Sequence, residues 1–177
     1  MVVGGPANER YADWSPDGNR VVFDSDRSGR RELYIVARGA DGSWQEPRLL
    51  TTGGGYLGRW SPDGRAITYR WERSLYVIAP DSGGPRRILE AAAWNESQGF
   101  PSFAIWSPDS RTIYFRVVEP LGAASFWALP AAGVKPRLLV RFHNPAFSAR
   151  PEFASDGKRF YFTASDRQSD IWVMEVR

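Results

Sequence analysis

The pentapeptide Trp14-Ser-Pro-Asp-Gly18 is repeated, with small changes, three more times along the chain. The later copies are Trp60-Ser-Pro-Asp-Gly64, Trp106-Ser-Pro-Asp-Ser110 and Phe153-Ala-Ser-Asp-Gly157. Their leading aromatic residues lie 46, 46 and 47 residues apart. A fixed period of this length is typical of stacked β units, and it fits propeller blades of four strands.

Each repeat presents the same succession of elements. A short strand ends at the aromatic residue, and the Pro, Asp and Gly that follow are residues that favour a tight turn. A second strand alternates apolar side chains, as in Val21 and Phe23, which is the period of a β-strand. The third strand, such as Leu33-Tyr-Ile-Val36, is apolar throughout and is therefore expected to lie between two other layers. A short fourth strand carries Arg beside apolar residues, which suits an exposed edge.

The repeats predict an all-β chain, a β-propeller with four blades of four antiparallel strands. We expect one domain over residues 1–177, and essentially no helix, with Ile88–Asn95 as the one segment suited to a helical turn. The fourth repeat ends after its third strand, so we expect Val2-Val3 to supply the missing fourth strand. Because Ser110 stands where the other repeats have Gly, we expect it to carry a conformational cost. The expected blades are 11–50, 58–89, 103–139, and 150–176 completed by 1–4.

Composition excludes several classes of function. The chain has no Cys, which removes disulfides, thiol catalysis and Cys-based metal sites. No apolar run reaches the ~18 residues that a membrane helix needs, and no signal peptide is recognisable, so we expect no membrane insertion. The net charge is only +3, with Arg spread over all repeats, so a nucleic-acid partner is not expected.

The repeated residues resemble the TolB-like β-propeller repeat, a relative of the WD repeat. The shared features are the aromatic-Ser-Pro-Asp-Gly turn, an aliphatic-x-aromatic strand, Ser-Asp-Arg, and an aliphatic-aromatic-Val strand, and they cover Tyr11 to Val176. The resemblance implies a binding platform, and it favours a periplasmic or other extracytoplasmic location. Related propellers serve in translocation, as gating domains of peptidases, and as sensor ends of membrane-bound kinases.

The number of repeats departs from that family, whose rings usually have six or more blades. Four blades form an unusual small ring, or pair with a second copy as half of an eight-bladed dimeric ring, or belong to a longer protein. We rank self-association as a homodimer slightly ahead of the lone ring.

No catalytic or metal-binding constellation is visible in the sequence. The single His143 lies in a loop sequence, and the chain has no Gly-x-Ser-x-Gly motif, so we predict no enzyme activity. Asp24 and Asp26, and likewise Asp166 and Asp170, lack the spacing of a calcium loop. We interpret Asp26 and Asp166 as turn caps that accept backbone N–H groups. We expect no metal and no cofactor.

One rim of the propeller carries the candidate binding surface. The loops after the second and fourth strands are rich in aromatic residues and Arg, which is the composition of binding hot spots. We therefore predict a non-catalytic module that binds a protein or peptide there. The alternatives are a carbohydrate or small-ligand site, a propeller fragment of a larger peptidase or sensor kinase, and an excised or engineered assembly unit. The candidate residues are Tyr56, Arg70, Trp71, Arg73, Trp94, Phe100, His143, Phe147 and Arg150.

Overall fold

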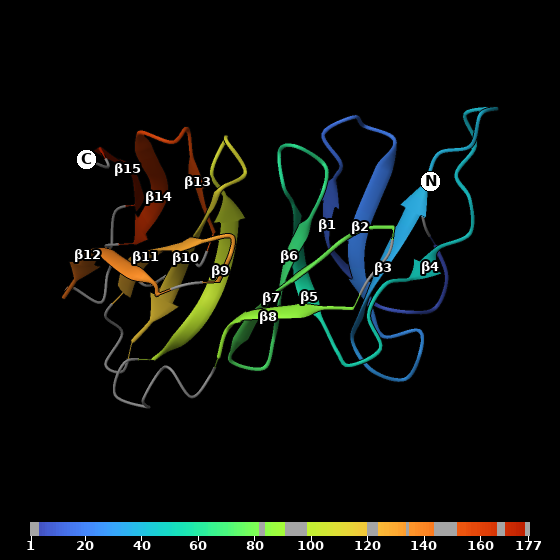
Figure 1. The fold of residues 1–177 in the computed structure, drawn as a ribbon, viewed down its shortest axis with the longest axis horizontal. Helices are drawn as coiled ribbons and strands as arrows, with labels where there is room; N and C mark the ends of the chain where they lie inside the picture. The colour runs from blue at the N-terminus through green and yellow to red at the C-terminus, as the bar shows by residue number, and fades with distance from the viewer. Residues whose placement is uncertain are drawn as a thin grey trace. The chain divides into compact units, whose positions relative to one another are not determined.

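The chain folds into four antiparallel β-sheets, each of which is one propeller blade, as the computed structural model shows (Figure 1). The structure describes residues 4–81, 84–90, 99–119, 124–133, 135–143, 152–165 and 169–175. Within these residues there is no helix, which confirms the all-β prediction. The predicted closing strand Val2-Val3 and residues 91–95 of the predicted helical turn lie outside them, whereas Ile88 and Leu89, the first residues of that predicted turn, belong to a strand.

The strands follow the chain in simple meanders. Three sheets have four strands, and the sheet formed by the last repeat has three within the described residues. The first sheet contains β1 (Glu9–Trp14), β2 (Arg20–Ser25), β3 (Glu32–Ala37) and β4 (Arg48–Leu49). The second contains β5 (Tyr56–Trp60), β6 (Ile67–Trp71), β7 (Ser74–Ile78) and β8 (Arg86–Leu89). The third contains β9 (Phe100–Trp106), β10 (Thr112–Val118), β11 (Ala124–Pro130) and β12 (Arg137–Phe142). The fourth contains β13 (Phe153–Ser155), β14 (Arg159–Ser165) and β15 (Ser169–Glu175).

The chain divides into two compact units. Residues 1–71 and 75–87 form the first unit, which holds blades 1 and 2, and residues 72–74 and 88–177 form the second. In the first unit β1 and β2 pack against β5, so that consecutive blades lie face to face. The described part of the chain contains no helix long and apolar enough to cross a membrane.

The serine of the repeated pentapeptide organises the turn. In the first repeat the buried Ser15 hydroxyl donates to Asp17 Oδ1 (2.5 Å) and accepts from the Arg20 N–H (2.9 Å). Asp17 in turn accepts from the Asn19 N–H at 3.1 Å. The same set of bonds recurs at Ser61 and Ser107. These bonds lower the pKa of each turn Asp, chiefly through the serine hydroxyl.

The fourth turn has Ala154 in place of that serine, and its Asp compensates. Asp156 Oδ1 accepts directly from the N–H groups of Lys158 (2.8 Å) and Arg159 (2.7 Å). In the third turn Ser110 has φ 59°, which is close to the φ of 70° for Gly18 and 71° for Gly64 at the same position of the first two turns. The expectation that Ser110 occupies a position suited to Gly is therefore confirmed.

Each unit has its own apolar core. In the first unit the facing sides of the two blades bury Val22, Leu33 and Ile35 against Trp60, Ile67, Tyr69 and Ile78. In the second unit a cluster of rings centres on Phe126, which stacks on Phe160 at 5.6 Å and meets Phe153 edge-on at 4.9 Å. Residues Leu33 to Val36 of β3 are all buried, as their apolar sequence predicted.

Candidate functional site

The candidate site lies in the first unit, where the loops after β2 and β4 meet the end of β6. The Gly55 N–H donates to the Arg31 carbonyl at 3.1 Å and so joins two of these loops. Tyr56, the first residue of β5, follows directly. Two cations lie against its ring, because the guanidinium of Arg31, in the loop after β2, is 4.7 Å from the ring centroid and that of Arg70, in β6, is 5.2 Å from it.

Trp71 completes this group, which we call the Tyr56 cluster: Arg31, Tyr56, Arg70 and Trp71. The indole meets the Tyr56 ring edge-on, with centroids 6.2 Å apart and planes at 77°. All four side chains belong to half-buried residues. Cation–π contacts of this kind are worth about 0.5–1 kcal/mol each where they are exposed. The cluster is thus an ordered surface that alternates aromatic faces with positive charge.

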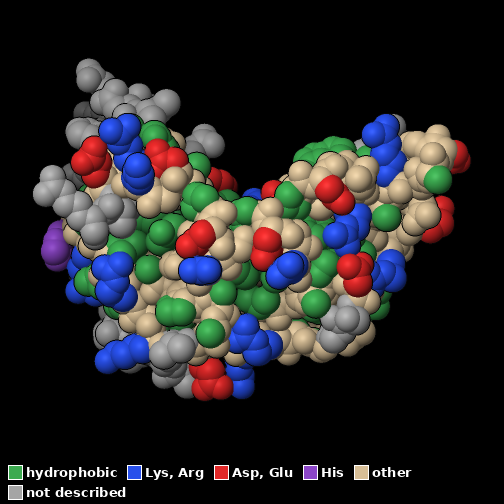
Figure 2. All heavy atoms as spheres, turned by 45° about the horizontal axis from the view of Figure 1, so that its top comes forward, with side chains coloured by type: hydrophobic (Ala, Val, Ile, Leu, Met, Phe, Trp, Pro, Cys, Tyr) green, Lys and Arg blue, Asp and Glu red, His purple; other side chains and the backbone are tan. Residues whose placement is uncertain are grey.

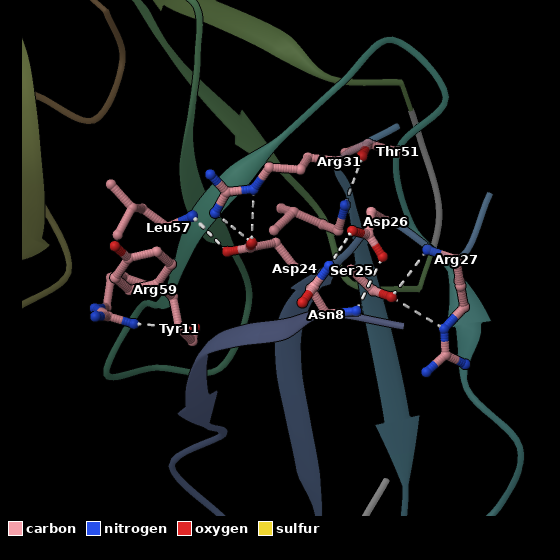
Figure 3. Close-up of polar contacts among 11 residues, drawn as sticks. Asn8, Tyr11, Asp24, Ser25, Asp26, Arg27, Arg31, Thr51, Leu57 and Arg59 are labelled. Atoms are coloured by element: carbon pink, nitrogen blue, oxygen red, sulfur yellow. Dashed lines mark hydrogen bonds and ion pairs between the residues drawn. The ribbon is translucent and has the colours of Figure 1, made fainter. Parts of the chain in front are cut away.

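A buried carboxylate fixes the position of Arg31. Asp24 is fully buried at the end of β2, and its Oδ2 accepts from Arg31 Nη2 (2.5 Å) and Nε (3.0 Å), as Figure 3 shows. Its Oδ1 accepts from the Leu57 N–H at 3.2 Å. Burial raises the pKa of Asp24, whereas the hydrogen bond and charge of Arg31 oppose that rise. Asp24 therefore ties β2, β5 and the arginine of the cluster together.

A second buried carboxylate orders the loop beneath Trp71. Glu32 accepts from the Thr51 hydroxyl (2.6 Å), the Gly54 N–H (2.8 Å) and Arg30 Nε (2.6 Å). Gly54 has φ 96°, and a Cβ there would lie only 2.2 Å from the Trp71 ring. Only glycine can therefore occupy this position without moving the indole, which rests directly on the Gly54 backbone.

The first strands of blades 1 and 2 each contain a bulge with a left-handed residue. Tyr11 has φ 51° and Leu57 has φ 58°, and the pairing registers shift around both positions. The two residues are 46 positions apart, which is the period of the repeat. Left-handed conformations cost a non-glycine residue roughly 1–2 kcal/mol. Here they turn the strand so that Tyr11 lies 5.7 Å from the Arg31 guanidinium and Leu57 bonds to Asp24.

The structure brings together three of the nine predicted site residues, Tyr56, Arg70 and Trp71. Two more, Arg73 and Phe100, belong to the second unit, where the guanidinium lies 6.0 Å from the ring centroid. His143 is exposed just after β12 and is the purple group in Figure 2. Trp94, Phe147 and Arg150 lie outside the described residues. Basic side chains are dispersed over the face drawn in Figure 2 and do not form one patch.

Asp24 and Asp26 do not converge on a common point, and Asp166 and the side chain of Asp170 lie outside the described residues. Asp24 binds Arg31, whereas Asp26 accepts from the backbone N–H (2.9 Å) and the amide (2.7 Å) of Asn8. Asp26 was expected to cap its own turn, but the Ser25 hydroxyl does so by accepting from the Arg27 N–H at 3.2 Å. No group of three or more His, Cys, Asp or Glu that could hold a metal occurs among the described residues.

Comparison with known proteins supports the fold assignment. No protein-family model matches the chain. An uncharacterized protein of Agrobacterium fabrum is 27% identical over 173 residues, which cover 92% of this chain and 53% of that protein. A putative TolB from Agrobacterium tumefaciens superposes with a TM-score of 0.76 at 23% identity, over 98% of this chain and 64% of the other. TolB from Acinetobacter baumannii superposes with a TM-score of 0.72 at 17% identity, over 97% of this chain and 41% of that protein.

The fold is that of the TolB β-propellers. The chain spans about half the length of the curated relative that it matches. Enzymes share the fold as well: an oligogalacturonate lyase from Vibrio parahaemolyticus superposes with a TM-score of 0.65 at 15% identity, over 93% of this chain and 49% of that one. An acylaminoacyl peptidase of Pyrococcus horikoshii superposes with a TM-score of 0.66 at 17% identity, over 96% of this chain and 31% of that protein. Similarity at this level of sequence identity establishes the fold alone. The function has to be argued from the residues of the site.

Proposed function

We propose that the chain is a non-catalytic interaction module that binds a protein or peptide segment at the Tyr56 cluster. The observation that supports this most directly is that the guanidinium groups of Arg31 and Arg70 both lie against the ring of Tyr56. Arg and aromatic side chains dominate the hot spots of protein interfaces. Because buried Asp24 already holds Arg31 in place, little side-chain entropy is lost when a partner binds.

The chemistry of the cluster favours a partner segment that carries a carboxylate next to an aromatic or aliphatic side chain. Guanidinium groups pair with carboxylates in a two-pronged geometry, and an apolar neighbour would pack on Tyr56 and Trp71. A sugar that stacks on Trp71 is the second candidate, because indole faces are common sugar platforms. It is less favoured here, since one face of the indole lies on Gly54. An extracytoplasmic location, suggested by the likeness to TolB, is part of the proposal, and fractionation of native cells tests it.

Selection from a random peptide display library against the immobilised chain tests the proposal. We expect the selected peptides to be enriched in Asp or Glu beside an apolar residue. Calorimetric titration should then show at least a tenfold loss of affinity for Tyr56→Ala and for Arg70→Ala. Arg65→Ala is the matched control, because Arg65 is exposed in the turn before β6, at the other end of that strand from Arg70, and its loss should leave affinity unchanged.

Two results would contradict the proposal. Selected peptides that bind Tyr56→Ala and the unmodified chain equally well would place the binding surface elsewhere. Cleavage of a selected peptide, detected by mass spectrometry and absent in the His143→Ala variant, would show that the chain is an enzyme.

A further inference from the structure

A cavity of about 320 Å³ lies between blades 1 and 2, at the other end of the strands from the Tyr56 cluster. Arg20, the first residue of β2, lines this cavity, whereas Asp24, near the end of the same strand, binds Arg31 of the cluster. Pockets of this volume hold small molecules, commonly through a few polar groups that converge over an apolar floor. The cavity is therefore a candidate for a second, separate site.

One face of blade 1 forms the floor of this cavity. Ile35 and Ala37 line it and are two residues apart on β3, so their side chains point to the same face of the sheet. Ile35 is paired opposite Arg48 of β4, and Ala37 is paired opposite Arg20 of β2. Directly opposed residues of an antiparallel pair share a face. The register therefore places two arginines beside an apolar floor, on the face that packs against blade 2.

Blade 2 holds both guanidinium groups in place. Arg20 Nη1 donates to both carboxylate oxygens of Asp81, at 3.0 and 3.1 Å, and the guanidinium lies 4.7 Å from the ring centroid of Trp60. Arg48 Nη2 donates to the Pro80 carbonyl at 2.6 Å. Among the described residues no acceptor binds Nε or Nη2 of Arg20, or Nε or Nη1 of Arg48. Each guanidinium is thus ordered and can still donate to a further acceptor.

The turn that precedes β2 does not require an arginine. The Arg20 N–H donates to Ser15 Oγ. In blades 2 and 3 the same bond is made by the N–H groups of Ala66 and Thr112. Because these two blades form the turn without a cation, the Arg20 side chain is explained by what it contacts between blades 1 and 2.

Negative charge lines the same cavity. Asp81 is paired with Arg20, whereas Glu46, which precedes β4, bonds to no other residue in the described part of the chain. With Arg48, these side chains contribute two positive and two negative charges. A ligand matched to such a lining is neutral overall and carries one group of each sign, because complementary charges determine which molecule is accepted.

We propose that this cavity binds a small zwitterion, namely a free amino acid with an apolar side chain. The carboxylate of the amino acid accepts from Arg20 and Arg48, since guanidinium groups form strong charge-assisted hydrogen bonds with carboxylates. The ammonium group donates to Glu46. The apolar side chain packs on Ile35 and Ala37, which removes apolar surface of the ligand from water.

Ligand-observed NMR with a panel of free amino acids tests the proposal. We expect saturation to pass from the protein to apolar amino acids such as L-leucine, whose dissociation constant is then measured by calorimetric titration. N-acetyl-leucine lacks the ammonium group, and leucine amide lacks the carboxylate. We expect each of the two derivatives to bind at least tenfold more weakly than leucine, because one charged group of the cavity is left without its partner.

Two variants test the contacts separately. Glu46→Gln should weaken leucine at least tenfold and leave the affinity for N-acetyl-leucine unchanged, because only leucine has an ammonium group to lose its partner. Arg48→Gln should weaken leucine and N-acetyl-leucine alike, since both carry the carboxylate. Arg87→Gln is the matched control, because Arg87 begins the corresponding Arg-Ile-Leu sequence of blade 2 and does not line the cavity. Circular dichroism checks that all three variants keep the β spectrum.

Three outcomes would overturn the proposal. One is the absence of saturation transfer to every apolar amino acid of the panel. Another is an N-acetyl-leucine or a leucine amide that binds as tightly as leucine, since the ligand would then not be recognised as a zwitterion. The third is full affinity for leucine in both Glu46→Gln and Arg48→Gln, which would place the amino acid outside this cavity.

Discussion

Replacing Ser110 by Gly is expected to stabilise the protein by about 0.5 kcal/mol. Ser110 has φ 59°, in the left-handed region, where a Cβ costs roughly 1 kcal/mol. Gly removes that cost, but it also makes the unfolded chain more flexible, which offsets about 0.4–1 kcal/mol. The turn bond from the residue 110 N–H to the Ser107 carbonyl (3.0 Å) is a backbone bond and is kept. The expected gain in the free energy of unfolding is small, so the test depends on whether the change is positive or negative.

Urea denaturation followed by circular dichroism measures this change against two matched variants. Gly64→Ala introduces the cost that Ser110→Gly removes, and its Cβ would meet nothing closer than the Pro16 Cδ at 3.8 Å. We expect it to lose about 0.5–1 kcal/mol. Ser110→Ala keeps the Cβ and removes the hydroxyl, so it should show no gain. A Ser110→Gly variant less stable than the unmodified chain, together with a neutral Gly64→Ala, would show that the left-handed backbone at these turns carries no cost.

Two further predictions follow from the site and the turns. Gly54→Ala should destabilise the protein by about 2 kcal/mol or more, because the new Cβ must displace Trp71, and it should weaken peptide binding; Gly53→Ala, whose Cβ would meet no atom within 4 Å, should be close to neutral in both assays. The lowered pKa values of Asp17, Asp63, Asp109 and Asp156 contribute stability above the ordinary value of 3.8, and this stability should be lost as the pH falls through the folded-state values. The raised pKa of Asp24 acts in the opposite sense, since its charged form lowers stability as the pH rises from 3.8 through the folded-state value. Acid denaturation of Asp109→Asn, compared with the unmodified chain, should show a shallower loss of stability at low pH; an unchanged acid limb would contradict the assignment.

Local features of the sequence were sufficient to predict the blades. The 46-residue period, the turn residues and the apolar third strands each depend on a few neighbouring side chains, and all reappear in the structure. The same holds for Ser110, where comparison of repeats identified a position that requires a left-handed backbone.

The site was harder to predict because it depends on contacts between distant segments. Tyr56, Arg70 and Trp71 were identified from composition, but the reason that they form one surface is the ion pair between Asp24 and Arg31 and the loop ordered by Glu32. The residue types of Tyr11 and Leu57 gave no indication of a left-handed bulge in the sequence. Their 46-residue spacing was the available signal, and it becomes visible only when the repeats are aligned outward from the tryptophans.

Amide hydrogen exchange of the chain with a library-selected peptide bound is the most direct test of the proposed recognition surface. We expect the bound peptide to slow exchange in residues 26–31, 54–57 and 70–73, which form and adjoin the Tyr56 cluster. The turns at 15–18 and 61–64, at the opposite ends of the same strands, should exchange at the same rate with and without peptide. Protection concentrated in those turns, with none around Tyr56, would show that the peptide binds at the opposite rim and not at the Tyr56 cluster.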